Sequence, residues 1–140
     1  MPDYNKLCYE KFIACFPELL NNVEYSEMIE EAIEIGAHIL YEDVFCAYVL
    51  KLIDKKGSEE TEKKIEAAFN LIEELVNHEN FDVRNVAEVS FIERFVAELE
   101  PMKDVEKYLG PTSLRKARII AHKWFGYNPF TWEKEESPKK

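Results

Sequence analysis

The stretch at residues 85–100, NVAEVSFIERFVAELE, constrains the fold more than any other part of the chain. On a helical wheel its apolar side chains do not form one stripe, because Val86 and Ala87 lie on one side and Ile92 lies on the opposite side. A helix that is apolar around most of its circumference is normally buried on several sides. We therefore expect this helix to lie at the centre of the fold, with its neighbours packed around it.

Apolar residues recur at helical spacing along the rest of the chain and predict further helices. The expected ranges are 3–16, 26–36, 37–55, 58–77, 82–100, 102–108 and 112–125. The residues expected to cap them are Asp3, Ser26, Ser58, Asp82 and either Thr112 or Ser113. The helix at 37–55 either stands alone or continues the one before it. No segment alternates apolar and polar residues over the length of a strand, so we expect essentially no sheet.

Two of these helices carry apolar sides that should face the core. On the second helix the expected core residues are Met28, Ile29, Ala32, Ile33 and Ile35. On the last helix they are Leu114, Ala117, Ile120, Ala121 and Trp124. The acidic residues of the second helix, and the basic residues of the last, fall on the other sides.

Short connections and the absence of a linker predict one domain. A chain of 140 residues with 46% hydrophobic residues can bury one sizeable core. We expect residues 1–140 to form a single all-α domain, a compact bundle of six or seven helices packed partly like HEAT repeats around the central helix. Residues 127–140 form an aromatic and charged tail, and its Tyr127, Phe130 and Trp132 are expected to strap across the body rather than to anchor a partner.

The net charge of −10 is unevenly distributed. Residues 1–102 carry 9 basic and 23 acidic side chains, whereas residues 103–140 carry 9 basic and 5 acidic ones. A strongly acidic body disfavours nucleic acid and anionic membrane as partners, because both are polyanions. It favours a basic protein partner, or it serves only to keep the surface hydrated.

Cysteine usage and the N-terminal sequence predict a cytoplasmic protein. The three cysteines include no CxxC pair, which suits a reducing compartment, and we expect Cys8 and Cys15 to be small buried residues. The N-terminal sequence MPDYNKLCYE has no basic segment followed by an apolar one, as a secretory signal would. No apolar run approaches the length of a membrane span.

Two resemblances add to this picture. The run DVRNVAEVSFIERF at 82–95 resembles the second helix of a HEAT repeat, in which the acid caps the helix and the arginine, here Arg84, reaches toward neighbouring acids. The segments HILYEDVF at 38–45, FNLIEELV at 69–76, VRNVAEVSFIERF at 83–95 and YLGPTS at 108–113 together resemble an uncharacterised bacterial family of small all-helical proteins with links to toxin immunity. This resemblance implies a small helical domain and supplies no catalytic residues.

Some polar residues invite a site interpretation. His38 and Glu42 share a helix face and could hold a divalent metal, but no third ligand has motif spacing to them, so we favour a polar helix edge and expect no metal. Asn85, Ser90 and Glu93 on the central helix could line a pocket with a raised pKa at Glu93. We favour a structural role, in which these residues tie helix ends or loops to the core or reach the surface.

The remaining motifs argue against an enzyme and a cofactor. The sequence has no P-loop, dinucleotide fingerprint, GxSxG elbow or HExxH motif, so we name no catalytic residue. The last helix carries the cations Arg115, Lys116, Arg118, His122 and Lys123. In isolation such a helix would suggest a nucleic-acid or membrane surface. Within an acidic protein we expect Arg115 and Arg118 to pair with carboxylates of neighbouring helices.

The leading hypothesis is a binding protein, most specifically an immunity protein that neutralises a bacterial toxin stoichiometrically by docking an acidic face on a basic toxin domain. The residues expected to contact the partner are Glu30, Glu31, Glu34, Glu42 and Asp43, with Glu73, Glu74 and Glu79 as a second option. One alternative is a helical scaffold or adaptor that self-associates. Another is a metal-binding or small-molecule-binding protein that uses His38, Glu42 or Glu93. The oligomeric state is left open.

Overall fold

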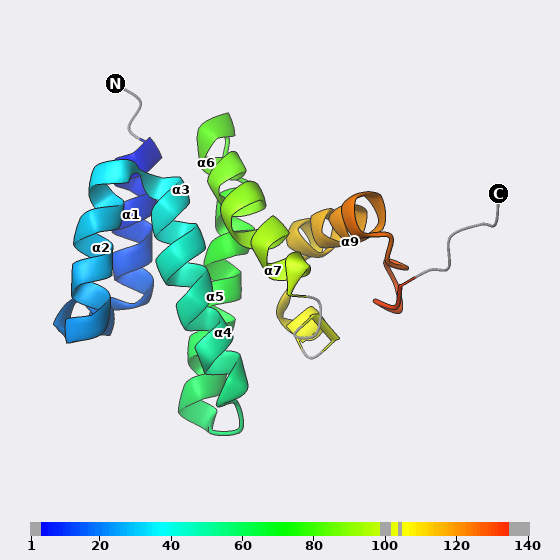
Figure 1. Ribbon diagram of the computed structural model, residues 1–140, viewed down its shortest axis with the longest axis horizontal. Coiled ribbons are helices and arrows are strands. Elements are labelled where there is room, and N and C mark those ends of the chain that lie inside the picture. The colour runs from blue at the N-terminus through cyan, green and yellow to red at the C-terminus, as the bar shows by residue number, and fades with distance from the viewer. Residues whose placement is uncertain (1–3, 99–101, 104, 135–140) are drawn as a thin grey trace.

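A computed structural model describes residues 4–98, 102–103 and 105–134, and Figure 1 shows that these are arranged as packed helices. The elements are α1 (Tyr4–Cys15), η1 (Pro17–Asn21), α2 (Val23–Ile35), α3 (Ala37–Ile39), η2 (Leu40–Phe45), α4 (Cys46–Asp54), α5 (Glu59–Val76), α6 (Phe81–Asn85), η3 (Val86–Glu93), α7 (Arg94–Ala97), η4 (Glu106–Tyr108) and α9 (Pro111–Phe125). No strand occurs in these ranges, where only two isolated β-bridges are found. The predicted all-α class is confirmed.

Two of the helices change their winding along their length. α3, η2 and α4 form one continuous helix over residues 37–54, and α6, η3 and α7 form another over residues 81–97; η2 and η3 are the π-helical parts. Counted in this way, the described residues form six helices, within the predicted six or seven. Gly36 separates α2 from α3, since its φ of 141° is a conformation that glycine adopts readily.

The helix at residues 81–97 is central, as predicted. Its buried residues are Val83, Val86, Ala87, Ser90, Phe91, Ile92, Phe95 and Val96, which surround most of its circumference. It packs against α5, α9 and η2, and among its larger apolar residues Phe81 at the first turn and Val89 are substantially exposed, at 66% and 40%. The helix ends at Ala97 and Glu98 forms a turn, so the predicted continuation is wrong at residue 98; residues 99–100 lie outside the described residues. The likeness to HEAT packing stays a prediction.

An aromatic cluster joins the central helix to its neighbours. The ring of Phe91 lies 5.5 Å from that of Phe45 on η2 and 5.7 Å from that of Phe69 on α5. Phe12 of α1 contacts Phe45 in turn, with ring centroids 5.8 Å apart. Tilted and edge-to-face pairs of this kind add stabilisation to the burial of the rings. The two π-helical segments, η2 and η3, therefore meet at the centre of the core.

The helix caps differ in part from those expected. Asn22, not Ser26, caps α2, because its side-chain oxygen accepts hydrogen bonds from the backbone N–H groups of Glu24 and Tyr25 at 2.9 and 3.2 Å. Asn80, not Asp82, caps α6 in the same way, with Asp82 N–H at 2.8 Å. Ser58 caps α5 as predicted, accepting from Thr61 N–H at 3.1 Å. The predicted cap Asp3 lies outside the described residues.

The prediction that Thr112 or Ser113 caps the last helix is wrong. α9 begins before both of these residues, at Pro111, and Gly110 in the cap position has no side chain to accept a bond. The carboxylate of Glu73, on α5, accepts from the N–H groups of Thr112 and Ser113 at 3.0 and 2.9 Å instead. The free N–H groups of α9 are therefore satisfied by a neighbouring helix.

Arg84, in the HEAT-like run, also acts on a helix end. The sequence suggested that it reaches toward neighbouring acids, but its guanidinium donates to the backbone carbonyls of His78 and Glu79 at 2.8 and 2.9 Å. These carbonyls follow the last turn of α5, where cations are favoured by the partial negative charge of the helix end. The arginine thus fixes the turn between α5 and α6.

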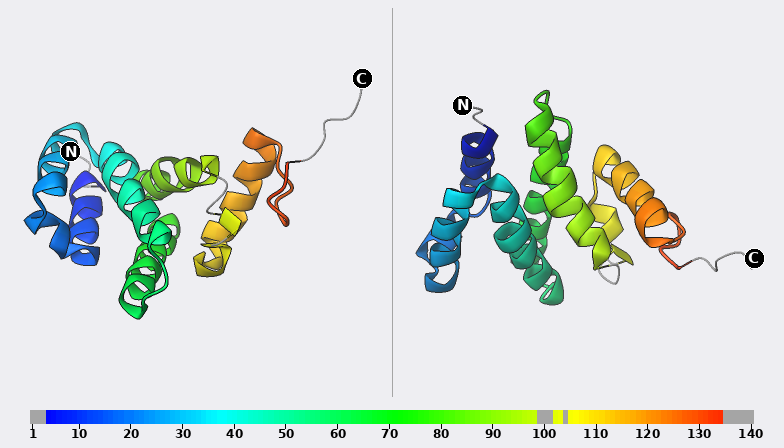
Figure 2. Two further views of the ribbon diagram at one scale, coloured as in Figure 1. Left: turned by 60° about the horizontal axis from the view of Figure 1, so that its bottom comes forward. Right: turned by 45° about the horizontal axis from the view of Figure 1, so that its top comes forward.

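The predicted core faces of the outermost helices are partly wrong. On α2 only Tyr25, Ile29 and Ala32 are buried, and Ile35 is 70% exposed, because α2 lies at the edge of the bundle and packs on one side only. On α9, Trp124 is 67% exposed, because the last turn points away from the body (Figure 1). Both views in Figure 2 show that α2 and α9 lie at opposite ends of the molecule.

Candidate functional site

Two surfaces at the ends of the molecule carry unburied charge next to apolar side chains, and α2 forms the first. Glu27, Glu30, Glu31 and Glu34 are spaced at i, i+3, i+4 and i+7, so they share one side of the helix, and all four are exposed. Ile33 lies among them, and with three of the glutamates it lines an open depression of about 400 Å³. We call Glu27, Glu30, Glu31, Ile33 and Glu34 the acidic face.

The glutamates of the acidic face have no side-chain hydrogen bond or ion pair to any described residue. Glu24, one turn earlier, differs, because it pairs with Lys51 of α4 at 3.4 Å. Four like charges on one helix side repel one another, and such an arrangement is relieved when cations approach. The acidic face therefore favours a positively charged partner.

An apolar pocket adjoins the acidic face. It has a volume of about 230 Å³ and is lined by Asn5, Lys6, Tyr9, Ile33, Gly36, Ala37 and Leu40. Ile33 belongs to both the pocket and the acidic face. The Asn5 side chain accepts a hydrogen bond from Ala37 N–H at 2.8 Å, which ties α1 to the start of α3 and holds the pocket walls together. The pocket can receive an apolar side chain while cations beside it meet the glutamates.

The other acids predicted to contact a partner are dispersed. Glu42 and Asp43 are exposed on η2, and Glu42 lies near Arg94, whose pKa is raised by its hydrogen bond to Glu98 and, to a lesser degree, by Glu42. Glu74 forms an ion pair with Lys11 at 2.5 Å. Glu79 is exposed beyond the end of α5.

The half-buried side chain of Glu73 is engaged in hydrogen bonds within the molecule. Besides the two backbone N–H groups of α9, its carboxylate accepts from the Ser113 hydroxyl at 2.7 Å and from the Asn77 amide at 3.0 Å. Burial raises the pKa of Glu73, but these hydrogen bonds to the charged form outweigh it, so the pKa is lowered. The second acidic option therefore does not form a continuous surface.

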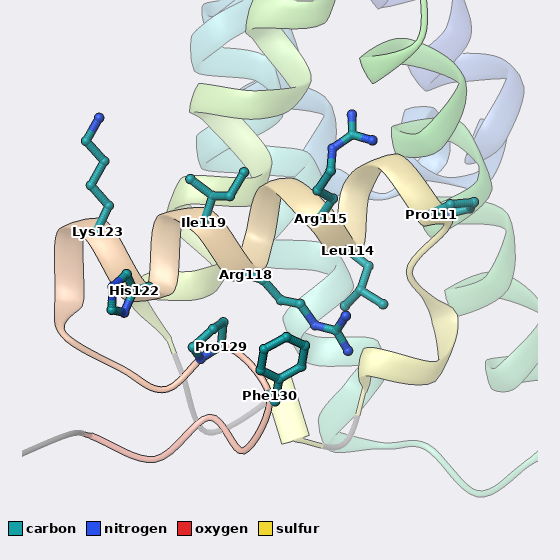
Figure 3. Close-up of a pocket in the computed structure, with 9 residues that line it drawn as sticks. All are labelled: Pro111, Leu114, Arg115, Arg118, Ile119, His122, Lys123, Pro129 and Phe130. Atoms are coloured by element: carbon teal, nitrogen blue, oxygen red, sulfur yellow. The ribbon is translucent and has the colours of Figure 1, made fainter.

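The second surface is a groove along the outer side of α9, and Figure 3 shows its side chains. It has a volume of about 770 Å³ and is lined by Pro111, Leu114, Arg115, Arg118, Ile119, His122, Lys123, Pro129 and Phe130. We call these nine residues the basic groove. Four of the lining side chains are basic and none is acidic. No acidic residue occurs in the sequence between Leu114 and Gly126.

One wall of the basic groove is held in place by Glu106 of η4. The Glu106 carboxylate accepts a hydrogen bond from the indole of Trp132 and lies 3.6 Å from the Arg118 guanidinium, as predicted for a pairing of Arg118 with an acid. Arg118 also lies over the ring of Phe130 at 4.8 Å, and Figure 3 shows the two side chains facing each other. Trp132 is only 3% exposed, so the tail straps onto the body there, while Phe130 stays 70% exposed.

Arg115 does not follow the prediction made for it. It is exposed, and no hydrogen bond or ion pair joins it to an acid among residues 4–98, 102–103 and 105–134. Lys116, on the other side of α9, pairs instead with Glu88 of η3 at 3.4 Å. Arg118 thus both lines the basic groove and pairs with an acid, whereas Lys116 pairs with an acid outside the groove and Arg115 lines the groove without one.

Of the polar residues predicted on the central helix, Ser90 makes a hydrogen bond within the fold. The Ser90 hydroxyl lies 2.6 Å from Nδ1 of His38, which links η3 to α3. A serine–histidine pair can serve nucleophilic catalysis, but Ser90 is only 1% exposed and a substrate cannot reach it.

Burial raises the pKa of Glu93, with a further contribution from Glu88. In the part of the chain that the structure describes, no three His, Cys, Asp or Glu side chains gather as metal ligands.

The cysteines are not poised for reaction. Cys8 and Cys46 are buried and Cys15 is half-buried, and burial raises the pKa of each thiol to about 12. Thiols with so high a pKa are almost entirely protonated at neutral pH, and the protonated form is a poor nucleophile. The interpretation of Cys8 as a small core residue agrees with its position.

Sequence reasoning missed the apolar pocket and the basic groove. The charge pattern of the last helix was visible, but the groove depends on Phe130 and Pro129 folding back beside α9. The apolar pocket depends on the angle between α1, α2 and α3, which no local pattern encodes. The hydrophobicity of Ile33 and Ile35 predicts core positions for both, but both side chains are exposed, which makes α2 a candidate contact surface.

Comparison with known proteins identifies the chain at the level of a family. A family model described as a domain of unknown function, DUF7674, matches residues 9–124, which run from within α1 to the penultimate residue of α9. Neither the curated proteins nor the solved structures contain a match. Within the described residues, no helix has both the length and the apolar character needed to cross a bilayer.

Proposed function

The chain belongs to the DUF7674 family, and from this premise we propose that it is a protein-binding domain whose acidic face receives a basic partner. The observation that carries the proposal is the row of glutamates on α2, which have no partners in the described part of the chain and stand beside an apolar pocket. The negative charge of such a surface attracts a basic partner during the encounter. The adjoining pocket can bind an apolar side chain of that partner.

The more specific form of the proposal is an immunity protein that binds a toxin stoichiometrically. Basic side chains of the toxin would meet Glu30, Glu31 and Glu34, while an apolar side chain of the toxin would enter the apolar pocket next to Ile33. The net charge of −10 would speed the encounter with a basic domain. Inhibition would follow from covering the toxin's active site, and the mechanism requires neither catalysis nor a cofactor.

Among the other predicted acids, Glu42 and Asp43 have a smaller role in this proposal. They are exposed on η2, which packs against α2, so they can extend the negative field of the acidic face. Glu73 and Glu74 are engaged with Ser113 and Lys11, so neutralising them would disturb the fold more than the partner contact.

The test is co-expression with a toxin encoded next to this protein's gene. Cells should tolerate the toxin only in the presence of this chain, and the two proteins should copurify. Glu30→Lys with Glu34→Lys should abolish both protection and copurification, whereas Lys55→Ser with Lys63→Ser, two exposed cations elsewhere, should leave both intact. Protection without a complex, or a complex that the Glu30→Lys/Glu34→Lys variant still forms, would overturn the proposal.

A further inference from the structure

We propose that the basic groove is an interface for a second copy of this chain, whose acidic face docks into it head to tail. The groove is the largest of the hollows described above, at about 770 Å³, and it combines cations with exposed apolar side chains. Ile119 is 55% exposed and Phe130 70% exposed, and contiguous apolar groups of this size on a surface mark an interaction site. The occupant must therefore be both anionic and apolar.

The acidic face has the complementary chemistry. It presents four glutamates, and Ile33 and Ile35 are exposed on the same helix. Arg115 and Lys123 of the groove are exposed cations, and Arg115 has no acidic partner within the described residues. Glutamates of one copy can pair with these cations of another, while an isoleucine of α2 lies against Leu114 and Ile119. This apolar component matches an amphipathic helix better than a phosphate backbone.

The geometry makes the contact intermolecular. α2 and α9 lie at opposite ends of the molecule in Figures 1 and 2, so the acidic face of a chain cannot reach the basic groove of the same chain. The two helices have 13 and 15 residues, which correspond to about 20 Å and about 22 Å at the rise of an α-helix. They can therefore lie along one another over their full lengths.

The contact joins two different surfaces, so it does not close on itself in a dimer. A head-to-tail contact leaves an unused acidic face at one end and an unused basic groove at the other, and it therefore extends to a ring or an open series. The inference uses the same acidic face as the proposed function, but it does not depend on any external partner. Where both hold, a basic partner on α2 competes with the second copy.

The experiment uses two variants that each lose one surface by neutralisation. Arg115→Ser with Lys123→Ser removes cations from the groove and keeps the acidic face. Glu30→Gln with Glu34→Gln weakens the acidic face and keeps the groove. All four side chains are exposed, so both variants should fold, which circular dichroism and thermal melting would verify. Arg118 is left unchanged because it supports Phe130 and Glu106.

Sedimentation velocity over a concentration series should show association of the wild-type chain beyond the dimer. Each variant alone should associate at least roughly tenfold more weakly. An equimolar mixture of the two variants should form a 1:1 dimer and grow no further, because only one intact pair of surfaces remains. Lys55→Ser with Lys63→Ser should associate like the wild type.

Three results would overturn the inference: a wild-type chain that stays monomeric up to roughly 0.5 mM, association that both variants retain, or a mixture that stays monomeric. None of these results bears on the proposed function, because protection against the toxin is measured separately. Conversely, a wild-type chain that associates head to tail but does not bind the toxin would contradict the proposed function and leave this inference standing.

Discussion

At the scale of single residues, Glu73 shows how a surface-like acid can serve the fold. The sequence places it in an acidic run next to Glu74, and nothing local indicates that it caps a helix that begins at Pro111. Its carboxylate provides the side-chain cap that Gly110 cannot provide. The interaction joins residues about 40 positions apart, so it could not be predicted from local pattern.

Gly110 and Glu73 should be energetically coupled. A Cβ atom added at Gly110 would come within 3.0 Å of three side-chain atoms of Glu73, which are held by hydrogen bonds. We expect Gly110→Ala to lower the free energy of unfolding by about 1–3 kcal/mol. In a Glu73→Ala background the same change should cost at least about 1 kcal/mol less. Urea unfolding of the four proteins measures this coupling, and strictly additive effects would contradict it.

Glu73 also makes the stability of the fold depend on pH, in a direction that its pKa shift predicts. Burial raises the pKa of Glu73, but the hydrogen bonds from Ser113, Thr112 and Asn77 lower it by a larger amount. The pKa in the folded state therefore lies below the ordinary value of 4.5. A group with a lowered folded pKa stabilises the protein above its unfolded pKa and loses this contribution as pH falls through the folded value. Below pH 4.5 the wild type should therefore lose more stability than Glu73→Gln. Parallel urea-unfolding curves for the two proteins over this range would exclude the effect.

The two candidate caps of α2 can be separated by substitution. Asn22 accepts two backbone hydrogen bonds, whereas the Ser26 hydroxyl only donates to the Val23 carbonyl at 3.3 Å. Asn22→Ala should lower the free energy of unfolding by about 1 kcal/mol, the usual worth of a cap. Ser26→Ala should change it by less than about 0.5 kcal/mol. Thermal unfolding measures both, and a larger loss from Ser26→Ala would restore the cap expected from the sequence.

At the scale of elements, helical periodicity located most of the helices but not their winding or their exposed sides. The apolar circumference of the 81–97 helix predicted its central position, because few other environments accept such a helix. The π-helical turns of η2 and η3 left no recognisable sequence signal. Hydrophobicity predicts core positions for Ile33, Ile35 and Trp124, but all three are exposed because α2 and α9 each pack on one side only. Hydrophobicity alone does not distinguish a residue that is buried in the core from one that is exposed at the surface.

At the scale of the whole molecule, charge is separated along the long axis. The acidic face lies at the α2 end and the basic groove at the α9 end, and Figure 1 shows these two helices at opposite ends of the molecule. The core between them is rich in aromatic side chains. The uneven charge of the sequence predicted this asymmetry in outline. It could not predict that the α9 cations line a groove, since this depends on how Trp132 anchors the tail through Glu106.

We propose that partner binding depends on the acidic face rather than on negative charge in general. Titration calorimetry against the purified domain of the proposed toxin tests this with two variants of equal net charge, Glu30→Lys/Glu34→Lys on α2 and Glu59→Lys/Glu66→Lys on the exposed side of α5. We predict that the α2 substitutions raise the dissociation constant at least about tenfold. The dissociation constant of the α5 variant should stay within about twofold of that of the wild type. Equal weakening by both variants, or none by the α2 variant, would contradict the account.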